Sequence, residues 1–288
     1  MAIDYDKLMN WPFGQVEQTY TAKDSILYAL GLGLGADPLD TDQLRYVFEE
    51  AAGFAALPTM AVVLAGPGFW ARDPNSGISW QKVLHGEQEI VLHAPVPPAA
   101  TMVAETKITE IIDKGADKGA LLYQQRTLVE KTSGTKVATL YSTTFARADG
   151  GFGGPTGPTR PVHSLPDRAP DGFCDLPVLP QAALIYRLSG DPNPLHADPA
   201  VAAAAGFKAP ILHGLCSLGV AGHAILKTCC DYDPSRFKSL GLRFSAPVYP
   251  GETIRTEIWR DGEVVSFRAR VLERDQVVLN NGKAVVAN

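Results

Sequence analysis

Alternating hydrophobic and polar residues predict β-strands in both halves of the chain. In the first half, residues 120–130 and 136–145 alternate with the period of a strand that buries one face. In the second half, the same alternation covers residues 253–259, 264–272 and 276–279. An apolar, helix-like stretch precedes the strands in each half. Helices followed by runs of short strands favour an α+β fold.

Two helices are predicted ahead of the second group of strands. The shorter one has Asp198 as its cap, Pro199 in its first turn and Gly206 after its end. The longer one, residues 213–227, contains three glycines. Each glycine costs about 1 kcal/mol relative to alanine inside a helix. We therefore expect this helix to pack tightly, or to let another group approach its backbone.

A segment rich in glycine and proline separates the two halves. It opens at Gly150-Gly151-Phe152-Gly153-Gly154-Pro155, and no hydrophobic period follows before residue 180. We divide the chain accordingly into an N-terminal unit of residues 1–150, a linker of residues 151–175 and a C-terminal unit of residues 176–288.

The two units resemble each other in sequence. Residues 93–98, His-Ala-Pro-Val-Pro-Pro, align without gaps on residues 245–250, Ser-Ala-Pro-Val-Tyr-Pro. Earlier in each unit, Ile-Leu-Tyr-Ala-Leu-Gly at 26–31 corresponds to Leu-Ile-Tyr-Arg-Leu at 184–188. Both similarities occur in the same order, which indicates a duplication. Each unit is expected to wrap an antiparallel sheet around one helix.

The composition is that of a globular protein, with 45% of the 288 residues hydrophobic and 20% charged. A net charge of -5 argues against nucleic-acid binding, which needs a basic surface. No apolar run approaches the roughly 20 residues that span a bilayer, so membrane insertion is not expected. Neither end shows a secretory or peroxisomal signal, and we expect a cytoplasmic protein with reduced cysteines.

The segment Asp191-Pro192-Asn193-Pro194-Leu195-His196 contains the residues best suited to acid–base chemistry. Its prolines exclude a regular helix, so an ordered turn can aim the carboxylate and the imidazole at one point. Together these groups can take a proton from water and supply one to a substrate. Asn193 adds a donor and an acceptor between them. On these six residues alone, the alternative is that Asp191 caps a turn and His196 caps the following helix.

The start of the longer helix favours the catalytic interpretation. Pro210-Ile211-Leu212-His213-Gly214 places a glycine where that helix begins. Backbone N–H groups at a helix N-terminus are unpaired and stabilise negative charge. Glycine also lets a carbonyl oxygen come close. An acid–base turn followed by such a site is what the polarisation of a thioester carbonyl requires.

Residues 186–196 read Tyr-Arg-Leu-Ser-Gly-Asp-Pro-Asn-Pro-Leu-His and resemble the motif of the hydratase 2 enzymes. These are the MaoC-like (R)-specific enoyl-CoA hydratases, which include the hydratase region of peroxisomal multifunctional enzyme type 2. The resemblance extends over nearly the whole chain. It implies a double hot-dog fold in which Asp191 and His196 are the catalytic dyad, Asn193 holds the water and the Gly214 N–H binds the thioester oxygen. The first half has no Asn-Pro-x-His sequence, and the resemblance implies that it accommodates bulky acyl chains.

The resemblance also implies contacts to the coenzyme A ester, made by His85, Gly86, Lys114 and Phe244. Lys118 is an alternative to Lys114, because this loop is longer than the simplest version in the family. The alternative for His85 is a structural histidine, and we interpret His163 and His223 as structural or exposed. No set of His, Cys and carboxylate residues has metal-ligand spacing. We therefore expect no metal, and no cofactor apart from the CoA of the substrate.

The predicted reaction is the reversible syn hydration of a trans-2-enoyl-CoA to a (3R)-3-hydroxyacyl-CoA. The nearest alternative is a dehydratase acting on an acyl-carrier-protein or CoA thioester, which would use the same dyad. A thioesterase would not need the Asn-Pro-x-His turn, and a non-catalytic acyl-CoA-binding protein would not need an intact dyad. We expect a homodimer of the double unit.

Overall fold

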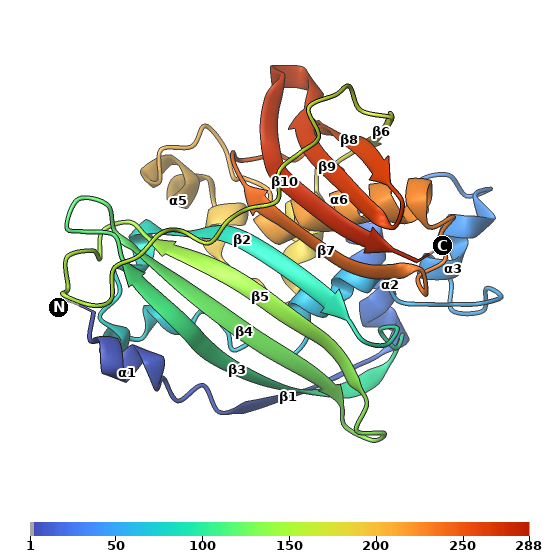
Figure 1. Cartoon of the computed structure of the whole chain (residues 1–288). Helices are drawn as coiled ribbons and strands as arrows, with labels where there is room; N and C mark the ends of the chain where they lie inside the picture. The colour runs from blue at the N-terminus through green and yellow to red at the C-terminus, as the bar shows by residue number, and fades with distance from the viewer. Residues whose placement is uncertain (1–2, 288) are drawn as a thin grey trace.

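The computed structural model describes residues 3–287, and ten strands form one sheet in it (Figure 1). Neighbouring strands all pair antiparallel, in the order β1-β3-β4-β5-β2-β7-β10-β9-β8-β6. The first half of the chain provides β1 (Gln15–Tyr20), β2 (Val83–Leu92), β3 (Ala100–Asp113), β4 (Ala120–Glu130) and β5 (Lys136–Ala146). The second half provides β6 (Gly172–Pro177), β7 (Phe237–Phe244), β8 (Thr253–Asp261), β9 (Val264–Val271) and β10 (Gln276–Val286). The five strands predicted from alternation are confirmed as β4, β5, β8, β9 and β10.

The strand order repeats about the centre of the sheet. β2 and β7 pair there and join the two half-sheets. Outward from this pair the strands follow as β5, β4, β3 and β1 on one side, and as β10, β9, β8 and β6 on the other. The two similar sequence segments, 93–98 and 245–250, lie directly before β3 and β8. The repeat in the fold therefore matches the repeat in the sequence.

Helix α6 (Gly214–Cys229) is the central helix of the second half and contacts β6, β7, β8 and β10. In the first half, the 3-10 helix η1 (Pro58–Val63) contacts β2 and β5 and lies beside α6. The double hot-dog fold is confirmed, but η1 has six residues where α6 has 16. Pro58 can only begin a helix, and the pair Val62-Val63 disfavours a longer one. The other α-helices are α1 (Tyr5–Met9), α2 (Ala22–Gly31), α3 (Thr41–Val47), α4 (Ala182–Tyr186) and α5 (Pro199–Ala204).

The glycines of α6 allow a close approach to the first half of the chain. A Cβ on Gly219 would lie 2.7 Å from the methyl carbons of Leu32, and one on Gly222 would lie 2.4 Å from Cγ2 of Thr59. Tight packing, expected from the cost of glycine in a helix, is therefore confirmed. Its partners are the helical segments of the other unit, which fixes the start of α6 relative to both halves.

The linker runs across the sheet on the face opposite to α6 (Figure 1). His163 lies in this segment; its Nε2 is 2.8 Å from Ser266 Oγ, and its carbonyl accepts a hydrogen bond from Asn281 Nδ2 at 2.9 Å. Its role is structural, as interpreted from the sequence. The predicted linker ends too late, because β6 begins at Gly172. Pairing with β8 forms this strand in a segment whose own composition gives no strand signal.

All four cysteines are buried and free, in agreement with the expected reduced thiols. Within residues 3–287, no helix combines the length and the apolar character needed to cross a bilayer.

Candidate active site

The turn between α4 and α6 is held by short-range hydrogen bonds. Gly190 has a φ of 118°, a left-handed conformation that directs the chain into Asp191. Asp191 Oδ1 accepts a hydrogen bond from the Asn193 N–H at 3.2 Å, and Asn193 Oδ1 accepts one from the Leu195 N–H at 3.1 Å. Asn193 thus caps the 3-10 helix η6 (Pro194–His196). Its Oδ1 shapes the turn, which leaves Nδ2 for the water that the resemblance assigns to it.

His196 is held in one tautomer by the main chain. Its Nδ1 lies 2.8 Å from the carbonyl oxygen of Ile211, which can only accept, so Nδ1 bears the hydrogen and Nε2 has a free lone pair. The side chain is 8% exposed. Burial lowers the pKa of His196, and the Ile211 carbonyl and the Asp191 carboxylate oppose this shift. His196 is therefore neutral at pH 7 and able to accept a proton.

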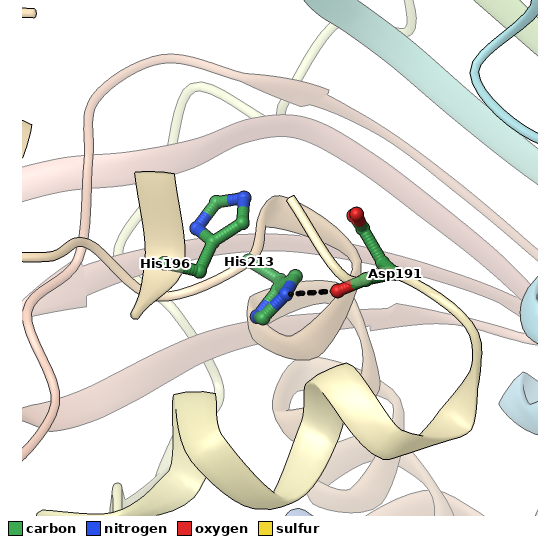
Figure 2. A group of neighbouring side chains, drawn as sticks. All are labelled: Asp191, His196 and His213. Carbon is green, nitrogen blue, oxygen red and sulfur yellow. Dashed lines mark hydrogen bonds between the residues drawn. The ribbon is translucent and has the colours of Figure 1, made fainter. Parts of the chain in front are cut away.

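His213 is a third titratable residue at this site, and the sequence did not reveal it. Its ring stacks on that of His196, with centroids 3.8 Å apart and planes 28° from parallel. Its Nε2 donates to the main-chain carbonyl of Asp191 at 3.1 Å (Figure 2). Burial, followed by the proximity of His196, lowers the pKa of His213 to about 4, so it is neutral. His213 thus contacts both members of the dyad.

The three side chains bring potential metal-ligand atoms within 4.8 Å of one another, although their sequence spacing gave no such signal. One ring nitrogen of each histidine is already bonded to a main-chain carbonyl. The rings are stacked face to face, whereas metal ligands must direct in-plane lone pairs at one point. This arrangement suits proton transfer between Asp191, His196 and water.

Gly214 is the first residue of α6, and His213 is its cap. The Gly214 N–H has no acceptor among the described residues, as expected at a helix N-terminus. A Cβ on Gly214 would lie 3.2 Å from Cε1 of Phe244, the last residue of β7. The ring of Phe244 in turn lies 4.8 Å from that of His85. The structure therefore brings three of the predicted residues together beside the dyad.

His85 and Gly86 lie at the start of β2, where the pairing with β5 is interrupted by a bulge. A Cβ on Gly86 would lie 3.2 Å from the carbonyl oxygen of Thr143, so the bulge favours glycine. Bulges of this kind re-aim neighbouring side chains. Gly86 thus helps to direct His85 towards Phe244, and its contact with the CoA ester stays a prediction.

Lys114 has no hydrogen bond to Asp191 or His196 in the described part of the chain. It directly follows β3, and its Nζ donates to the Gly157 carbonyl at 2.9 Å, while Lys118 is exposed. Strand pairing places both at the same end of the half-sheet as His85. The neighbouring glycine-rich loop wraps Asp113, whose carboxylate accepts hydrogen bonds from the N–H groups of Gly115, Gly151 and Gly153. Those N–H groups are therefore not free to bind phosphate, and a phosphate contact of either lysine stays a prediction.

Comparison with known proteins places this geometry in a family. Residues 18–148 match the model of the MFE-2 hydratase 2 N-terminal domain, and residues 161–281 match that of the MaoC like domain. The chain is 40% identical over 295 residues to a probable enoyl-CoA hydratase 2 of Dictyostelium discoideum, which covers 99% of this chain and 97% of that protein. The chain belongs to the MaoC-like hydratase 2 family.

Two further relatives show how far the similarity extends. 3-Hydroxyacyl-thioester dehydratase Y of Mycobacterium tuberculosis is 41% identical over 272 residues, covering 91% of each protein. The crystal structure of a MaoC-like dehydratase from Phytophthora capsici superposes with a TM-score of 0.87 at 37% identity, covering 99% of both chains. The resemblance inferred from residues 186–196 is therefore confirmed over the whole chain.

Proposed function

We propose that this member of the hydratase 2 family hydrates trans-2-enoyl-CoA thioesters to (3R)-3-hydroxyacyl-CoA. One arrangement supports this most directly: the Asp191 carboxylate and the neutral ring of His196 lie together beside the free N–H of Gly214. The pair can exchange protons with water and substrate, and the N–H can stabilise charge on the thioester oxygen. Relatives named enoyl-CoA hydratase agree with this assignment.

In the proposed reaction, the thioester oxygen accepts a hydrogen bond from the Gly214 N–H. The start of α6 stabilises the negative charge that develops there as water adds. The water oxygen bonds to C3, one water proton passes to the dyad, and the dyad delivers a proton to C2 on the same face. Asp191 and His196 end the cycle as they began it. Because the two groups are coupled, both proton transfers belong to the pair.

Hydration involves no net oxidation or reduction, and the Gly214 N–H can polarise the thioester oxygen in place of a Lewis acid. We therefore propose that CoA participates only as part of the substrate and that the site works without a metal. His213 serves the dyad by position: it holds the main chain of Asp191 and the ring of His196 at once.

The second candidate is a dehydratase that runs the same chemistry in the direction of the enoyl thioester. It is favoured by the relative named 3-hydroxyacyl-thioester dehydratase. The dyad and Gly214 serve both directions equally, so the direction depends on the thioester that is supplied. Rates on matched CoA and acyl-carrier-protein thioesters, in both directions, decide between the two.

The test of the proposed function is hydration itself. Purified protein is expected to remove the absorbance of the conjugated enoyl thioester and to form the (3R) product. A thiol reagent is expected to detect no free CoA, since the thioester bond stays intact. Release of CoA without hydration would assign a thioesterase instead, and saturable binding without turnover would assign an acyl-CoA-binding protein.

The homodimer and the cytoplasmic location stay predictions. A dimer is supported by exposed apolar side chains on neighbouring helical segments, Leu30 at 40%, Leu184 at 54% and Leu188 at 61%. Light scattering at several protein concentrations measures the oligomeric state, and a monomer throughout would contradict this prediction. The location is tested by fractionating the source cells.

A further inference from the structure

Arg126 is a cation on the inner face of the first half-sheet. It lies in β4, and its Nη2 donates to the carbonyl oxygen of Val62 in η1 at 2.6 Å. Among residues 3–287, no Asp or Glu forms an ion pair with it. Its Nε and Nη1 have no hydrogen-bond partner there, yet they are not sealed from solvent. Arg126 is half-buried, and its guanidinium therefore keeps free N–H groups that are in part exposed to solvent.

Arg126 is partly desolvated by the protein around it. Burial lowers its pKa to about 10, so it stays charged at neutral pH. By contrast, Arg243 on β7 has a carboxylate partner, Glu87, at 2.7 Å. A charge that is desolvated and lacks a counter-ion is unfavourable unless another group supplies the opposite charge. The protein itself does not supply one at Arg126.

Arg126 lies close to the catalytic site on the same face of the sheet. Strand register aligns Arg126 with Leu140 and Ile90. It aligns Leu122 with Thr144 and His85, so both rows lie on the same face of the sheet. Desolvation by the neighbouring protein lowers the pKa of His85 to about 4, with Asp191 opposing the shift and Arg126 adding to it. The residue is still exposed to solvent. His85 thus lies near both Asp191 and Arg126.

Polar side chains accompany Arg126 on this face. Gln124 precedes it on the same face of β4, and Thr106 is its neighbour on β3. Ser142 is paired with Gln124, and Thr144 Oγ1 lies 3.4 Å from Gln124 Oε1. A pocket for a plain hydrocarbon chain needs none of these groups. We refer to Arg126, Gln124, Thr106, Ser142 and Thr144 as the polar row.

We propose that Arg126 binds a carboxylate on the acyl chain of the substrate, with the polar row as further donors. The preferred substrates are then enoyl-CoA esters whose acyl chain bears a carboxylate remote from the thioester. This inference rests on the proposed function, because it assumes that the acyl chain lies over the first half-sheet, where η1 stands in place of a long helix. A guanidinium that keeps free N–H groups in a partly desolvated site is well suited to a carboxylate.

The experiment compares pairs of acyl-CoAs of equal length that end in a methyl group or in a carboxylate, over a series of chain lengths. Affinity is measured by calorimetry with saturated, unreactive acyl-CoAs, and kcat/KM is measured with the matching trans-2-enoyl-CoAs. Wild-type protein is expected to favour the carboxylate at one range of lengths. Arg126→Met should abolish this preference. The carboxylate-to-methyl ratio of affinity and of kcat/KM should fall by about 10- to 100-fold, since hydrogen bonds to charged groups contribute about 1.5–3 kcal/mol. Arg126→Lys should restore part of it.

Arg243→Met is the matched control. It removes an arginine of the same sheet that is bonded to Glu87, and its carboxylate-to-methyl ratio should equal that of the wild type. No preference in the wild type at any length overturns the proposal. The proposal is also overturned if Arg126→Met loses the same affinity for the methyl-ended and the carboxylate-ended acyl-CoA of each pair. That result would mean that Arg126 binds the CoA moiety or stabilises the fold. Failure of the proposed function gives a different result from either of these outcomes. Wild type would then not turn over the methyl-ended substrates, while the ratio of its affinities for the carboxylate-ended and methyl-ended acyl-CoAs could still be measured.

Discussion

His213 is expected to control the activity of the dyad without contacting the substrate. The test is His213→Phe, with His223→Phe as its matched control. Both histidines are in or at the start of α6, both are at most 3% exposed, and burial lowers the pKa of each to about 4. In each, Nε2 has a hydrogen-bond partner and Nδ1 is buried without one. Only His213 touches Asp191 and His196.

The two substitutions should change stability by similar, small amounts. Each loses one hydrogen bond, at about 1 kcal/mol, and each removes an unpaired buried nitrogen that costs about 1–3 kcal/mol. The two terms oppose each other, so we expect a change in the free energy of unfolding of about 2 kcal/mol or less. For a chain of this size, 1 kcal/mol corresponds to about 2–4 °C in Tm.

The activities should differ strongly. Phenylalanine retains the stack on His196 but cannot hold the Asp191 carbonyl, and a misplacement of about 1 Å costs about 100-fold in rate. We expect kcat of His213→Phe to fall by about that factor, while kcat of His223→Phe stays near the wild-type value. Initial rates of enoyl-CoA hydration and thermal melts of the three proteins measure both quantities. Equal kcat values for the two variants would refute the positioning role.

Three further predictions concern the helix start and the histidines. Gly214→Ala places a methyl group 3.2 Å from Phe244, next to the N–H that binds the thioester oxygen. We expect kcat to fall by about 100-fold or more, with Tm nearly unchanged. A normal kcat in steady-state assays would contradict the role of this N–H in binding the thioester oxygen. Because the pKa of His196 lies below its usual 6.5, kcat/KM should stay constant from pH 8 down to about 6.5 and fall only in more acidic buffer. A fall in kcat/KM that begins above pH 7 would argue against a neutral His196. Burial lowers the pKa of His213 and of His223 from the usual 6.5 to about 4 in the folded protein, so the unfolded state binds more protons below pH 6.5. The free energy of unfolding should therefore decline from pH 6.5 to 4, and less steeply in His223→Phe. An equal decline with pH in that variant and in wild type, measured by denaturation, would contradict this.

The sequence predicted those parts of the molecule whose signal is local. The alternating residues 120–130 became β4 without a shift of either end, and Asp198, Pro199 and Gly206 delimit α5 as predicted. The Asp191–His196 turn was identified because two prolines and two titratable residues lie within six positions. In each case neighbouring residues determine the conformation.

Other parts depend on contacts that the sequence does not display. His213 was passed over because its two partners, Asp191 and His196, are 22 and 17 residues away, and only the fold stacks it against the dyad. Arg126 looked like one polar residue among others in an alternating strand, since its lack of a carboxylate partner is a property of the packed sheet. The start of β6 was missed for a similar reason: pairing with β8 determines it.

The central claim is that Asp191 and His196 together hydrate enoyl-CoA thioesters. The most direct measurement is the rate of enoyl-CoA hydration by wild type, Asp191→Asn and His196→Ala, with the chirality of the product determined. We predict that wild type forms the (3R)-hydroxyacyl-CoA and that each variant, although folded, loses about 10²–10⁴-fold in kcat. Full activity in either folded variant, or a (3S) product from wild type, would contradict the account.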